Sequence, residues 1–90
     1  MVLGPVSNVW FEPDSGFSPG KNVTCKADGH PRPSVSWIRT SNNATVAHSP
    51  TFSAKSANYS YVCIATNTVR GQVYTVTSTE VNFDASAGIH

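Results

Sequence analysis

The stretch Tyr61-Val62-Cys63-Ile64-Ala65-Thr66-Asn67 decides which fold this chain can adopt. It reads as a strand, in which successive side chains point to opposite faces, so that Tyr61, Cys63 and Ala65 share one side. A second segment of the same period surrounds Cys25, where apolar and polar residues alternate from position 22 to 27. Two strands that each carry a cysteine on the apolar side predict two sheets that face each other.

Cys25 and Cys63 are the only cysteines, so pairing would give one disulfide that closes a loop of about 37 residues. The chain-entropy estimate for such a loop is about 4 kcal/mol. Trp37 shares a strand face with Val35, and we expect it to pack against the bridge. The alternative is a pair of free buried thiols in a cytosolic protein.

The rest of the chain is also predicted to form strands. Turn residues recur at short intervals, and no stretch keeps apolar residues at helical spacing for three turns. We expect strands at residues 6–12, 21–28, 34–40, 44–48, 50–55, 59–67 and 72–83. The predicted fold class is all-β: a two-sheet antiparallel sandwich of about seven strands with one inter-sheet disulfide.

The register of the last predicted strand is ambiguous. One phase turns Val81 and Phe83 inward, together with Val73, Thr75, Thr77 and Thr79. The other phase would bury Glu80 and Asn82, and burying such groups without partners costs several kcal/mol. We predict the first phase and allow for a bulge that switches phase part-way along the strand.

Length and charge exclude several classes of function. Ninety residues suffice for one small domain, which we place at residues 1–84, with 85–90 as a linker or a remnant of recombinant expression. The net charge is +1 and only 12% of residues are charged, so we expect no nucleic-acid partner. No apolar run approaches the roughly 18 residues of a membrane helix, and we expect no direct membrane contact.

Catalysis is not expected either. His30, His48 and His90 are scattered, and no pair has a metal-ligand spacing. No two carboxylates form a tight pair, and a disulfide would leave no thiol nucleophile. We therefore predict a non-enzymatic chain with no metal and no cofactor.

The pattern of Cys25, then Trp37 twelve positions on, then Cys63 with Tyr61 two positions before it, resembles the immunoglobulin superfamily. Residues 29–37 are similar to the Gly-x-Pro-x-Pro-x-x-x-Trp segment of I-set and C2-type domains. Residues 61–67, followed by a glycine, are similar to the family's Tyr-x-Cys-x-Ala-x-Asn hairpin.

This resemblance implies a Cys25–Cys63 bridge between the sheets, a core pin made of Trp37 and Tyr61, and an extracellular module of an adhesion or recognition receptor. Nectins and carcinoembryonic-antigen-related adhesion proteins share parts of the pattern. The chain departs from the family at Ala57, where members often carry an aspartate that pairs with an arginine.

One outer sheet face is a candidate binding surface. Its predicted members are apolar, and they come from the third, sixth and last strands: Ile38, Val62, Ile64, Tyr74 and Val76. Such a face could dock on a protein ligand or on a second copy of the chain, with Tyr74 as the anchor. The alternative is that β-branched residues occupy exposed strands through propensity alone.

Three Asn-x-Ser/Thr sequons, at Asn22, Asn43 and Asn58, are candidate N-glycosylation sites. Sugars there would shield the opposite sheet and its rims and leave the apolar face open. We therefore expect an ectodomain module of a cell-surface adhesion or immune-type receptor, which binds protein or spaces neighbouring domains of its parent chain. The alternatives are an intracellular structural repeat of a muscle-type giant protein and a secreted ligand or decoy.

Overall fold

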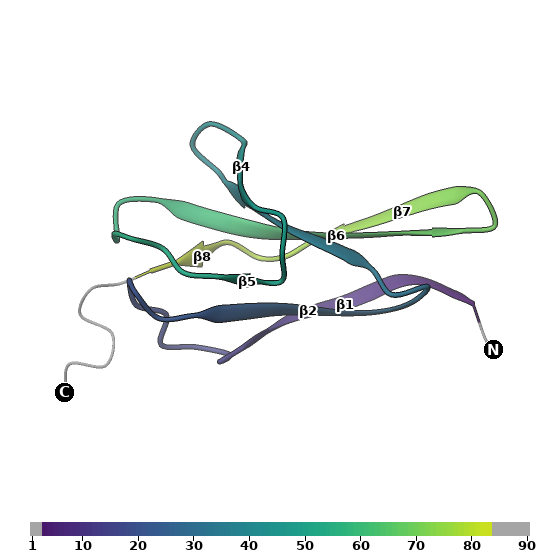
Figure 1. The fold of residues 1–90 in the computed structure, drawn as a ribbon, viewed down its shortest axis with the longest axis horizontal. Helices are drawn as coiled ribbons and strands as arrows, with labels where there is room; N and C mark the ends of the chain where they lie inside the picture. The colour runs from purple at the N-terminus through teal and green to yellow at the C-terminus, as the bar shows by residue number, and fades with distance from the viewer. Residues whose placement is uncertain (1–2, 84–90) are drawn as a thin grey trace.

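The computed structural model describes residues 3–83, which form two facing antiparallel sheets (Figure 1). The eight strands are β1 (Gly4–Glu12), β2 (Val23–His30), β3 (Ser34–Arg39), β4 (Ala44–Ala47), β5 (Thr51–Phe52), β6 (Ser60–Val69), β7 (Gln72–Thr77) and β8 (Val81–Asn82). One sheet has the order β1-β2-β5; the other has the order β4-β3-β6-β7, with β8 paired to β6. The predicted all-β, two-sheet architecture is confirmed. No helix within the described range is long and apolar enough to span a membrane.

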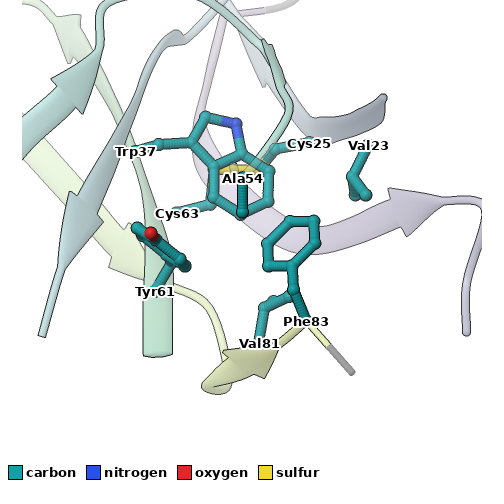
Figure 2. Packing of buried hydrophobic residues seen from close by; sticks show 8 residues of the cluster. All are labelled: Val23, Cys25, Trp37, Ala54, Tyr61, Cys63, Val81 and Phe83. Atoms are coloured by element: carbon teal, nitrogen blue, oxygen red, sulfur yellow. A yellow bond between two sulfur atoms is a disulfide. The ribbon is translucent and has the colours of Figure 1, made fainter. Parts of the chain in front are cut away.

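The disulfide joins the two sheets. Cys25 on β2 and Cys63 on β6 are bonded, their Cα atoms lie 6.5 Å apart, and their side chains are no more than 1% exposed. Trp37 is fully buried beside them, and its indole lies against the bridge in Figure 2. The indole Nε1 donates a hydrogen bond of 2.9 Å to the carbonyl of Pro50, so the one polar atom of this side chain is satisfied.

Aromatic rings fill the space on one side of the bridge. Phe52 contacts Trp37 and Tyr61, with ring centroids 5.4 and 4.9 Å apart, and Phe83 contacts Tyr61 at 5.7 Å. Phe11 and Phe17 extend the cluster from β1 and the loop that follows it. Such rings supply the apolar area that this chain, with its single leucine, does not obtain from aliphatic residues.

Two predicted strands differ from the observed ones. The segment 50–55 pairs only at Thr51–Phe52, after which the chain leaves the smaller sheet and buries Ala54, whose carbonyl accepts a hydrogen bond from the Gly20 amide. The segment 72–83 is divided into β7 and β8. The predicted tail at 85–90 lies outside the described residues.

A bulge divides β7 from β8 and reverses which side chains face the core. Ile64 pairs with Thr77 and Tyr61 pairs with Val81, so three positions along β6 match four along its partner. Ser78 spans the irregular segment: its amide donates to the Cys63 carbonyl, and its hydroxyl accepts from the Cys63 amide, both at 2.8 Å. The bulge that the prediction allowed for is therefore present, and the predicted phase is right for the buried Val81 and Phe83.

The same phase is wrong for Val73, Thr75 and Thr77, which lie on the outer side of the sheet; Thr79 is exposed in the irregular segment. Val73 is 58% exposed. The cause is the tight β6–β7 turn, in which Arg70 and Gly71 both have positive φ and Val69 pairs with Gln72. A two-residue hairpin of this kind fixes the register of both strands.

Candidate functional site

The predicted apolar face is only partly assembled by the structure. On the outer side of the larger sheet, Ile38 on β3 pairs directly with Val62 on β6, and Ile64 lies two positions further along β6. All three side chains are partly buried. We call this patch, made of Ile38, Val62 and Ile64, the outer face.

Tyr74 and Val76 do not belong to the outer face, which corrects the prediction. Tyr74 pairs with Asn67 and Val76 pairs with Ala65, and both partners are buried on the inner side of the sheet. Directly paired residues of antiparallel strands project to the same side. The register set by the β6–β7 turn therefore turns these two side chains toward the other sheet, and Tyr74 cannot anchor a ligand on the outer face.

The outer face is continued by hydroxyl-bearing side chains instead of apolar ones. Ile64 is flanked across the sheet by Ser36 on β3 and Thr77 on β7. Further along, the hydroxyls of Thr66 and Thr75 lie 3.3 Å apart. The result is a small aliphatic centre with a polar border, the arrangement typical of protein-binding patches.

Both members of the predicted core pin, Trp37 and Tyr61, are buried on the inner side of β3 and β6. Tyr61 is 3% exposed and packs between the rings of Phe52 and Phe83.

The three sequon asparagines are exposed and lie toward one end of the molecule. Asn22 immediately precedes β2, Asn43 immediately precedes β4, and Asn58 lies two residues before β6. The Thr40 amide, at the start of the β3–β4 turn, donates to the Ser60 carbonyl at the start of β6, and Val23 pairs with Phe52, whose ring contacts that of Tyr61 on β6. Figure 1 places the β6–β7 hairpin at the opposite end. Sugars on these residues would therefore cover one end of the sandwich. This differs from the sequence-based expectation that they would shield the smaller sheet.

Asn67 has a structural role that the sequence analysis did not assign. It is 5% exposed, and its Oδ1 accepts a hydrogen bond of 2.9 Å from the Val6 amide, while its Nδ2 donates to the carbonyls of Gly4 and Pro31 at 3.0 Å. We call this arrangement the Asn67 clamp. A signal for it was present, because Asn67 is in phase with Tyr61, Cys63 and Ala65, and alternation alone places it inside.

The contact between Arg39 and Tyr59, where β3 ends, was also not predicted from the sequence. The guanidinium carbon of Arg39 stands 4.3 Å from the ring centroid of Tyr59, a cation–π contact. Arg39 pairs with the buried Tyr61, so its side chain starts on the inner side of the sheet. No pattern in the sequence brought Arg39 and Tyr59 together, because they are twenty residues apart and neither belongs to a motif.

Residues 3–83 contain no group of three His, Cys, Asp or Glu side chains that could hold a metal ion. Comparison with protein-family models, with curated proteins and with solved structures finds no match for this chain.

Proposed function

We propose that this chain is an extracellular immunoglobulin-like module of a cell-surface adhesion or immune-type receptor, and that it binds protein through the outer face without catalysing a reaction. The observation that carries the proposal is the disulfide between the two sheets behind a buried indole. Disulfides of this kind form and persist in oxidising compartments and are rare in the cytosol.

The outer face supports the binding part of the proposal. Ile38, Val62 and Ile64 form a contiguous aliphatic patch with a border of serine and threonine, on a sheet surface that no other described element covers. A flat patch of this kind suits a protein partner, including a second copy of the chain, because contact removes apolar area from water at a gain of about 25 cal/mol per Å².

Ile64→Asp tests the binding surface, because it places a charge at the centre of the outer face. We expect the variant, displayed as a multivalent fusion, to bind cells at least about tenfold less than the parent, since an unpaired buried charge in an interface costs several kcal/mol. Gln72→Asp is the matched control: it makes the same charge change at an exposed position outside the outer face, and we expect no loss. Sedimentation of both proteins reports whether the partner is a second copy.

Ile64 is partly buried, so Ser36→Asp serves as a second variant that puts the charge opposite Ile64 at a residue that is already polar. If the parent is monomeric at high concentration and both face variants bind cells as the parent does, the outer face has no role in binding.

Redox state and glycosylation test the location. We expect the protein made in a secretory host to have no thiol that reacts with an alkylating reagent and to carry sugar on Asn22 and Asn58. Two reactive thiols in the native protein, together with unmodified asparagines, would favour the intracellular structural repeat instead.

A further inference from the structure

A cationic pocket lies at the end of β3, and none of the residues from 3 to 83 that line it is acidic. It has a volume of about 410 Å³, and Arg39 and Lys55 contribute its two positive charges. Ser53, Ser56 and Tyr59 add hydroxyl groups to its lining. We call this site the Arg39 pocket. It lies away from the outer face, because Arg39 is on the inner side of the sheet beside Tyr61.

Arg39 lacks a partner for part of its guanidinium. Its Nε is buried and makes no hydrogen bond to any atom of residues 3–83. The guanidinium carbon lies over the Tyr59 ring, but this contact does not give the Nε–H an oxygen acceptor. A buried donor without an acceptor is costly, so an acceptor that reaches this edge gains more than it would at a solvated arginine.

No carboxylate within residues 3–83 compensates the charge of the pocket. The one ion pair within the described part of the chain joins Lys26 and Glu12, 3.0 Å apart on the smaller sheet. Arg39 and Lys55 line the same pocket, and no carboxylate of residues 3–83 is among the residues that line it. One anion in this pocket would compensate their charge and offer an acceptor to the guanidinium.

The chemistry of the pocket selects a carboxylate among the anions. A guanidinium presents its donors in a planar fork that matches the two oxygens of a carboxylate, and the guanidinium of Arg39 is in contact with the Tyr59 ring. Beside the charges the pocket is lined by Val46 and Phe52, which suit the short carbon chain of an acidic side chain. We propose that the Arg39 pocket binds the carboxylate of an aspartate or glutamate side chain from a partner protein. This inference does not depend on the function proposed for the outer face.

The test titrates the disulfide-bonded, ¹⁵N-labelled protein with N-acetylglutamate N-methylamide as the probe, at constant ionic strength. We expect saturable shifts of the Arg39 Nε–Hε resonance and of the amides of residues 53–56. The neutral N-acetylglutamine N-methylamide is the matched probe and should cause none of these shifts. Inorganic phosphate is the competing anion and should bind more weakly than the glutamate probe.

Substitutions in the pocket distinguish the contribution of the planar guanidinium donors from that of the positive charge. Arg39→Lys keeps the charge but not the planar donors, and we expect at least about a tenfold loss of affinity for the probe. Lys55→Gln removes one exposed charge and should lower the affinity for the glutamate probe a few-fold without affecting the fold. It therefore keeps the test valid if the Arg39 variants unfold. Gln72→Lys, which adds a charge far from the pocket, should leave the affinity unchanged.

Three results would overturn the proposal. The first is a titration in which the glutamine probe shifts the same resonances equally. The second is phosphate binding at least as tightly as the glutamate probe, which would make this a phosphate site. The third is binding of the probe by Asp84→Asn but not by the parent, which would show that the chain's own carboxylate fills the pocket.

Discussion

The two halves of β6 are held in the sandwich by different physics. Tyr61 and Cys63, in the first half, lie among aromatic rings and carry the disulfide. Ala65 and Asn67, in the second half, face the other sheet with a methyl group and an amide, and the amide makes three hydrogen bonds. One strand therefore passes from an apolar core to a polar clamp within six residues.

The difference determines what each half tolerates. Burial of apolar surface is non-directional and scales with area, so the aromatic half depends on volume and is damaged most by cavities. Hydrogen bonds require both partners in place, so the clamp half depends on the shape of one side chain and of the backbone that surrounds it. Substitutions at Trp37, Asn67 and Gly29 test this difference, and the expected loss of stability decreases in that order.

Trp37→Ala should have the largest effect, a loss of about 5 kcal/mol in the free energy of unfolding. The indole is fully buried against the bridge, and its removal leaves a large cavity and takes one of the two hydrogen bonds from the Pro50 carbonyl, which keeps the Cys25 amide as a donor; the cavity places the change at the upper end of the range for such substitutions. Urea unfolding followed by Tyr fluorescence measures it. Trp10→Ala is the control, since that indole is 39% exposed and should cost far less. Equal losses for the two would contradict the assignment of the core.

Asn67→Ala should cost about 3 kcal/mol, at about 1 kcal/mol for each of its three hydrogen bonds. Asn67→Asp sharpens the result, because the carboxylate keeps the acceptor for the Val6 amide but loses both donors; we expect it to be destabilising as well. Hydrogen exchange of the Val6 amide separates the two variants: it should become fast with alanine and remain protected with aspartate. Protection that survives in the alanine variant would exclude the clamp as its cause.

Gly29→Ala should cost about 2 kcal/mol, the typical effect of overpacking. A Cβ at this position would lie 2.9 Å from the Asn67 Nδ2, 3.0 Å from the Pro33 Cγ and 3.1 Å from the Val6 Cα, so the added methyl strikes the clamp itself. The double variant with Asn67→Ala tests this coupling: its loss should be smaller than the sum of the single losses, because one of the three clashes is gone. Strict additivity in thermal or urea unfolding would show that Gly29 and Asn67 act independently. Gly4→Ala, where a Cβ meets nothing within 4 Å, is the control.

The sequence determined the fold class, the strands around both cysteines and the burial of Trp37, because alternation and turn residues are local signals. It also contained the register of β7 in the Arg70–Gly71 turn, which as a two-residue hairpin pairs Tyr74 with Asn67. The predicted outer face did not take this turn into account, and it therefore wrongly included Tyr74 and Val76, which project from the inner side of the sheet.

Contacts between residues that share no motif depend on the assembled sheets. The place of the bulge at Ser78, the burial of Ala54 and the contact of Arg39 with Tyr59 all follow from how the two sheets meet. Periodicity tells which residues share a side of one strand, but it does not tell which side faces the core when both carry apolar or small residues. The neighbouring strands settle that choice, because the free energy of burial belongs to the assembled layers and not to any one segment.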